Sequence, residues 1–70
     1  MNEEQFLSKT YTVIKQWKIG RFIMRIGDPL DVVDYGSGLV SNYLVFVNTR
    51  LPGHRFHTGT WYFEQNTKLK

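Results

Sequence analysis

Apolar and polar residues alternate along most of the chain, and turn-forming residues interrupt this alternation at short intervals. An alternation with period two, broken by glycine and proline, is typical of several short antiparallel strands. The pattern predicts strands over residues 10–19, 21–26, 30–35, 40–49 and 54–59, with a further edge strand over 66–69. It therefore indicates a small all-β domain of five to six strands.

Three short segments between these strands contain the residues that tight turns require: Gly27-Asp28-Pro29, Gly36-Ser37-Gly38 and Pro52-Gly53. Glycine tolerates positive φ, aspartate accepts hydrogen bonds from nearby backbone amides, and proline restricts φ. We expect positive φ at Gly27 and Gly53, because each stands near a proline within its turn.

Two segments have a weaker period-two pattern. Residues 3–9 are predicted to form one or two helical turns anchored by Phe6 and Leu7, the alternative being a frayed terminus. Residues 60–64 are predicted to form a short helical turn capped by Thr60, or else to continue the preceding strand.

The alternation assigns the apolar residues to two opposite faces. The face predicted to form the core contains Phe22, Met24, Ile26, Val32, Val45 and Val47. The opposite face is left with Ile14, Ile23, Val33, Leu44 and Phe46. A monomer would expose this second set in patches, and large exposed apolar patches usually mark a protein contact. The alternative is that the segment around Phe6-Leu7 or the turn at 61–63 covers that face.

The composition limits how the fold can be stabilised. A chain of 70 residues forms one domain with a thin core, and without cysteine it has neither disulfides nor thiolate metal sites. Aromatic residues, 16% of the chain, must therefore supply much of the buried area. The polar start lacks the features of an export signal, and no apolar run approaches the ~20 residues that span a bilayer. We expect a cytoplasmic protein without membrane contact, as a monomer or a homodimer.

The order of turns and strands resembles an SH3-like barrel. The resemblance covers residues 10–69 and rests on the Gly27-Asp28-Pro29 turn, the strand that follows it, the longer pair joined by Pro52-Gly53 and the short turn before the last strand. It implies a small antiparallel β-barrel of five to six strands preceded by a short helical segment over 1–9. The acidic run and the paired tryptophans of peptide-binding SH3 domains are missing, which argues against proline-rich peptides as ligands.

Residues that could carry catalysis or hold a metal are few. Asp28, Asp31 and Asp34 recur at every third position, but the last two point to opposite faces of one strand. His54 and His57 likewise fall on opposite faces, with no cysteine nucleophile and no serine elbow in the sequence. We therefore expect a protein that is not an enzyme, with no metal and no cofactor.

Basic and aromatic residues give the stronger functional signal. The net charge is +3, and the basic residues that could contact nucleic acid lie along the two predicted hairpins: Lys15, Lys18, Arg21, Arg25, Arg50 and Arg55. Small barrels bind single strands through a cationic groove and aromatic faces. The aromatic residues that could instead anchor a protein partner are Tyr35, Tyr43, Trp17 and Trp61, of which the two tyrosines flanking Gly36-Ser37-Gly38 are favoured.

These observations favour a small accessory or regulatory factor that binds one larger protein. Compact chains of this kind resemble the accessory proteins that phages and mobile elements encode to modify host machinery. The alternative is a nucleic-acid-binding barrel that uses its basic hairpins.

Overall fold

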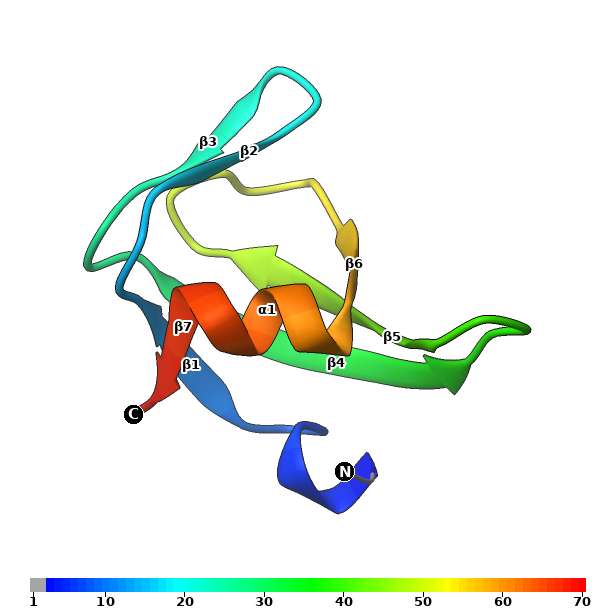
Figure 1. Ribbon diagram of the computed structural model, residues 1–70. Helices are drawn as coiled ribbons and strands as arrows, with labels where there is room; N and C mark the ends of the chain where they lie inside the picture. Colours follow the sequence, from blue (N-terminus) through cyan, green and yellow to red (C-terminus); the bar gives the residue numbers. More distant parts are fainter. Residues whose placement is uncertain (1–2) are drawn as a thin grey trace.

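The computed structural model describes residues 3–70, so Met1 and Asn2 of the predicted N-terminal segment lie outside the described residues (Figure 1). In chain order the elements are η1 (Glu3–Gln5), β1 (Thr10–Val13), β2 (Trp17–Ile19), β3 (Phe22–Met24), β4 (Pro29–Ser37), β5 (Asn42–Asn48), β6 (Phe56–Gly59), α1 (Thr60–Asn66) and β7 (Thr67–Leu69).

The strands form a five-stranded antiparallel sheet of order β6-β5-β4-β1-β7 and a separate two-stranded hairpin, β2-β3. The nine-residue β4 joins the two halves of the sheet, because its first residues pair with β1 and nearly its whole length pairs with β5. The β2-β3 hairpin is inserted between β1 and β4 and lies above the sheet in Figure 1. The prediction of a mainly β antiparallel protein is therefore confirmed.

The predicted closure into a barrel is not found. Within residues 3–70, β6 and β7 end the sheet, each with a single paired neighbour. The residues that join these two edges form α1, which follows β6 and precedes β7 without an intervening residue. Figure 1 shows α1 lying across one face of the sheet. Because α1 buries Phe63 completely against that face, the helix covers the core where a closing ladder would otherwise lie.

The structure also corrects the predicted position and length of the helical segments. Near the N-terminus the structure has a three-residue 3-10 turn, η1, and the α-helix lies near the C-terminus. Helix α1 begins at Thr60, as the sequence indicated, but it continues to Asn66. Its N-cap is Gly59, without a side-chain hydrogen bond, so Thr60 is not the cap that we predicted.

The predicted turn conformation is confirmed at Gly27 and Gly53, whereas Gly36 and Ser37, which we predicted in a turn, are the last residues of β4 and pair with β5. Gly27 has φ of 93° and Gly53 has φ of 84°, a region that favours glycine over residues with a Cβ. Gly27 also continues the sheet, because its amide donates to the carbonyl of Val13 at 2.8 Å while the amide of Val13 donates to the carbonyl of Asp28 at 3.0 Å.

A β-bulge in β4 determines which side chains face inward. The register between β4 and β5 shifts between Val32 and Asp34, so Val33 is the extra residue. Leu30 and Val32 point into the core before the bulge, and Tyr35 points inward after it, opposite Leu44. The bulge thus reverses the odd-even alternation that the sequence pattern predicted for the second half of β4.

The core is built on the face of β5 that we assigned to the exterior. Leu44 and Phe46 are completely buried, and Phe46 packs on the ring of Phe63 at 5.3 Å. The core cluster comprises Phe6, Tyr11, Val13, Trp17, Met24, Leu30, Val32, Leu44, Phe46, Phe56 and Phe63. The alternative raised from the sequence therefore holds for Leu44 and Phe46, which share one buried cluster with Phe6 and Phe63, whereas Ile14 and Val33 of the same predicted set are exposed.

The residues predicted to form the core have three different outcomes. Val32 and Val45 are buried as expected, although Val45 lies outside the core cluster, on the outer face of the sheet between Asp34 and His57. Phe22 and Val47 are only half-buried, and the prediction for Ile26 is wrong because this side chain is 69% exposed.

Candidate functional site

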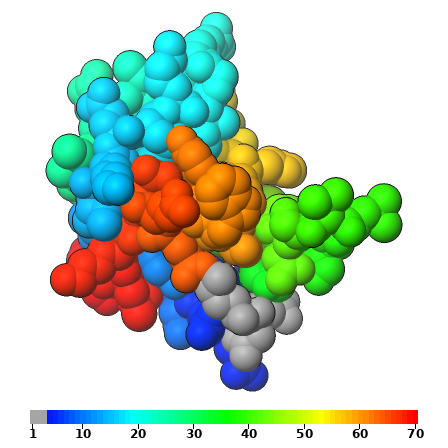
Figure 2. Space-filling model, viewed as in Figure 1, coloured from blue at the N-terminus to red at the C-terminus, as the bar shows by residue number. Residues whose placement is uncertain are grey.

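The β4-β5 hairpin projects from the body of the molecule (Figures 1 and 2). Its tip is closed by a hydrogen bond from the amide of Gly38 to the carbonyl of Ser41 at 2.9 Å. Leu39 and Val40 lie between these residues, and both are fully exposed. Two branched apolar side chains are thus presented to solvent at the outermost point of a projecting hairpin.

Tyr43 lies on the same hairpin, two register positions from the tip. It pairs with Gly36 on β4 and with Gly59 on β6, so a glycine flanks it on either side. The Tyr43 ring leans across Gly36, where a Cβ would collide with it. The side chain remains 40% exposed, because the flanking glycines present no side chain that could cover it.

Trp61 lies on the β6 side of Tyr43, over Gly59. A Cβ on Gly59 would come within 3.2 Å of Nε1 of Trp61, so the indole lies over the outward side of that glycine. Because Gly59 and Tyr43 are cross-strand partners, their outward directions are shared, and Trp61 and Tyr43 lie on neighbouring positions of one surface. Trp61 is 57% exposed and packs edge-on against Tyr62 at 5.5 Å.

The structure separates the four aromatic residues that we predicted as protein contacts. Tyr43 and Trp61 are both exposed, with Trp61 over the cross-strand partner of Tyr43, and together with Leu39 and Val40 they form what we call the hairpin surface. Tyr35 is half-buried and stacks on Phe6 at 6.0 Å. Trp17 is buried in the core cluster, so its indole is placed for packing. The sequence did not single out the two aliphatic residues at the tip.

The basic residues also divide into two groups. Lys15, Lys18, Arg21, Arg25 and Arg55 are exposed on the β2-β3 hairpin, its flanks and the β5-β6 connection. Arg50 instead forms an ion pair with Asp28, with 3.0 Å between the guanidinium and the carboxylate. Nη2 of Arg50 also donates to the carbonyl of Ile23.

Asp28 is the centre of this buried polar cluster and is only 9% exposed. Its carboxylate accepts hydrogen bonds from Nδ2 of Asn48 at 3.0 Å, from the Arg25 amide at 2.9 Å and from Nε of Arg50 at 3.1 Å. Burial alone would raise the pKa of Asp28, but these hydrogen bonds and the Arg50 charge outweigh it and lower the pKa below its ordinary value. The cluster joins the base of the β2-β3 hairpin to the end of β5.

The bulge at Val33 puts Asp31 and Asp34 on the same face of β4, opposite Val47 and Val45, so the prediction that they point to opposite faces is wrong. Asp31 accepts a hydrogen bond from the hydroxyl of Thr10 at 2.6 Å, and Asp34 accepts one from the Tyr35 amide. His54 packs against Phe22 with ring centres 4.5 Å apart and the two rings tilted by 49°. In the described part of the chain, no three histidine, aspartate or glutamate side chains converge on one point.

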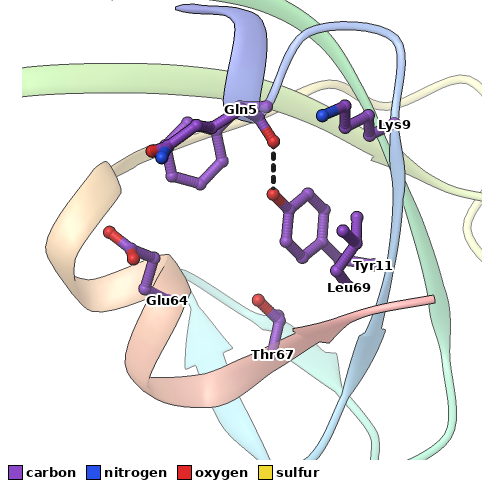
Figure 3. A pocket seen from close by; sticks show the side chains of 7 residues that line it. Gln5, Lys9, Tyr11, Glu64, Thr67 and Leu69 are labelled. Atoms are coloured by element: carbon purple, nitrogen blue, oxygen red, sulfur yellow. Dashed lines mark hydrogen bonds between the residues drawn. The ribbon is translucent and has the colours of Figure 1, made fainter. Parts of the chain in front are cut away.

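A cleft of about 340 Å³ opens between η1, β1, α1 and β7 (Figure 3). Tyr11 forms one wall, and its hydroxyl donates to the carbonyl of Gln5 at 2.6 Å. Burial, together with the nearby charge of Glu64, raises the pKa of Tyr11, so the phenol stays protonated. The Thr67 hydroxyl donates to the carbonyl of Phe63 at 2.7 Å. Both hydroxyls are therefore engaged in holding the N-terminal turn and the helix end in place.

Within residues 3–70, no helix combines the length and the apolar composition that crossing a membrane requires. Comparisons of the chain with known protein families, with curated proteins and with solved structures found no match, so the function has to be inferred from the residues themselves.

Proposed function

We propose that the protein is a small, non-enzymatic, cytoplasmic accessory or regulatory factor that binds one larger protein through the hairpin surface. The observation that carries this proposal is the full exposure of Leu39 and Val40 at the tip of a projecting hairpin, which also carries the exposed Tyr43, with the exposed Trp61 over the neighbouring strand. Apolar groups gain free energy by leaving water, and tyrosine and tryptophan are enriched among the residues that dominate interface energetics.

The shape of the hairpin surface indicates the kind of partner surface that fits it. The tip is narrow and projects, so its partner is concave, with an apolar cleft that receives Leu39 and Val40. Tyr43 and Trp61 lie behind the tip and would contact the rim of that cleft, where their polar groups can bond to water or to the partner. Gly36 and Gly59 keep the approach to both rings free of side chains.

We further propose that the fold belongs with SH3-like small barrels in a half-open form. Supporting features are the Gly27-Asp28-Pro29 turn before β4, the β5-β6 pair joined around Pro52-Gly53, and the helical segment directly before the last strand. The hairpin surface does not depend on this assignment.

Affinity capture with substituted proteins tests the proposed function. Leu39→Ser/Val40→Ser should abolish capture of a specific protein that the wild type retains from host lysate, and Trp61→Ala should weaken it. Ile26→Ser is the control, because Ile26 is also an exposed branched apolar residue, at 69%, but lies before the Gly27 turn, outside the hairpin surface. If the tip variant and the control retain the same proteins as the wild type, the hairpin surface is not the contact.

A further inference from the structure

The charges of the chain are segregated. Residues 14–27 and 49–57 contain six of the nine lysines and arginines and no aspartate or glutamate. The rest of the chain contains the remaining three lysines and all six acidic residues. Two short segments thus concentrate the positive charge, although the net charge of the whole protein is only +3.

The fold brings these two segments together. The Phe22 ring of the β2-β3 hairpin lies 4.5 Å from that of His54 and 5.3 Å from that of Phe56, and Arg50 bonds to the carbonyl of Ile23. In Figure 1 the β5-β6 connection runs beside the β2-β3 hairpin. We call the exposed cations of this region the basic end: Lys15, Lys18, Arg21, Arg25 and Arg55.

The positive charges of the basic end have few acidic partners within the protein. The nearest acidic residue in sequence, Asp28, is buried and already paired with Arg50. Across residues 3–70, none of the five cations of the basic end forms an ion pair. Their charge is therefore available to an external anion.

Aromatic rings lie among these cations. The Arg21 guanidinium lies 5.3 Å from the centre of the half-buried Phe22 ring, and the exposed His54 packs against the same ring at a tilt of 49°. His54 and Arg55 also line a hollow of about 410 Å³ formed by the β5-β6 connection. A cationic surface with an exposed ring beside a hollow can hold phosphates and stack an unpaired base.

We propose that the basic end binds single-stranded nucleic acid, with its lysines and arginines on phosphates and His54 against a base. This site is separate from the hairpin surface, so either proposal can fail without the other. An acidic protein segment would satisfy the charges but would not use the ring and hollow, and a duplex would keep its bases stacked inside.

Fluorescence anisotropy with a labelled oligothymidylate of about 16 nucleotides, titrated at several salt concentrations, tests the proposal. Each phosphate contact on a single strand contributes about −0.7 to the slope of log K against log salt, so Arg21→Gln/Arg25→Gln should make the slope shallower by about 1.4. Lys68→Gln/Lys70→Gln is the matched control, because it removes the same charge from β7 and the residue after it and should leave the slope unchanged.

Three competitors separate the kinds of anion. An abasic strand of the same length should bind about fivefold more weakly or worse, the loss expected for one stacked base. Duplex DNA or polyglutamate that competes as well as the single strand would overturn the proposal, and so would equal slope changes in the two double variants. Lys18→Gln/Arg55→Gln should also make the slope shallower, which keeps the test decisive if the first variant fails to fold.

Discussion

Asp28→Asn is the substitution that most directly probes how the β2-β3 hairpin is held. Asparagine keeps the shape of the side chain but removes the charge that faces Arg50 across 3.0 Å. Because Asn48, Arg25 and Arg50 all donate to Oδ2 of Asp28, the new amide would take the place of Oδ1, which faces Nε of Arg50 at 3.3 Å. The change thus keeps an acceptor for the Arg25 amide and for Asn48, but it removes the charge of the ion pair and places an amide donor against the Arg50 guanidinium.

The expected loss of stability follows from this geometry. A hydrogen bond to a charged group stabilises a fold by about 1.5–3 kcal/mol. Breaking a fully buried ion pair reduces the stability by about 3–5 kcal/mol. The Arg50 side chain is 32% exposed, so water screens the ion pair and the lower range applies. We expect Asp28→Asn to reduce the free energy of unfolding by about 2–3 kcal/mol, which is a large part of the total for a domain of this size.

The pH dependence provides a second readout. The pKa of Asp28 is lowered in the folded protein from an ordinary value of 3.8, so the folded state favours the ionised form. The resulting stability is therefore present above pH 3.8 and is lost as the pH falls through the folded-state pKa. The pH dependence of the free energy of unfolding is measured by urea unfolding of the wild type and the variant, at neutral pH and at a series of acidic values.

The two proteins should differ most at neutral pH and converge in acid, because protonation of Asp28 removes the same charge that the substitution removes. A constant difference across the series would show that the carboxylate charge does not stabilise the fold. A loss below about 0.5 kcal/mol at neutral pH, which is typical of surface substitutions, would show that the cluster is not a structural tie.

Three further substitutions test the core and the turns. Leu44→Ala should reduce the free energy of unfolding by about 2–5 kcal/mol, and Val47→Ala by clearly less; equal losses in urea unfolding would place the core on the wrong face of β5. Gly27→Ala should destabilise by about 1 kcal/mol or more, because alanine is strained at a φ of 93°; an unchanged thermal midpoint would contradict that backbone conformation. Gly36→Ala should destabilise by about 1–3 kcal/mol by driving its Cβ into the Tyr43 ring, and the double variant with Tyr43→Ala should recover most of this loss; additive losses would argue against the contact.

The sequence predicted the positions of the strands well, because turn chemistry is local. Gly27 and Gly53 have the backbone conformation that their neighbouring prolines indicated, and every predicted strand region contains strand residues, although residues 10–19, predicted as one strand, form β1 and β2 of two separate sheets. The choice of faces was less predictable. Strand β5 has apolar residues on both sides, so its period-two pattern fits either orientation equally well, and the bulge at Val33 reverses the alternation without a glycine to mark it.

The prediction of the candidate site residues was limited because a sequence pattern contains no information on long-range contacts. Trp17 and Trp61 are indistinguishable in type, yet one packs in the core and the other is exposed, because only the fold determines which surface each faces. Arg50 looked like any other cation of the hairpins, and its partner lies 22 residues away in the chain. Leu39 and Val40 could have been recognised as exposed, because they follow directly on the Gly36-Ser37-Gly38 segment in which a turn was expected.

The pairing of β1 with β7 has a consequence for how this protein is made. Strand β1 is synthesised early, but one of its two neighbours is complete only when residues 67–69 exist, and the amide of Lys70 bonds to the carbonyl of Thr10. Until then β1 keeps one open edge, and Phe63 lacks the strand that fixes the far end of its helix. Until residues 67–69 are made, a nascent chain of this protein therefore carries an unpaired strand edge and an incompletely fixed core, two features that favour aggregation.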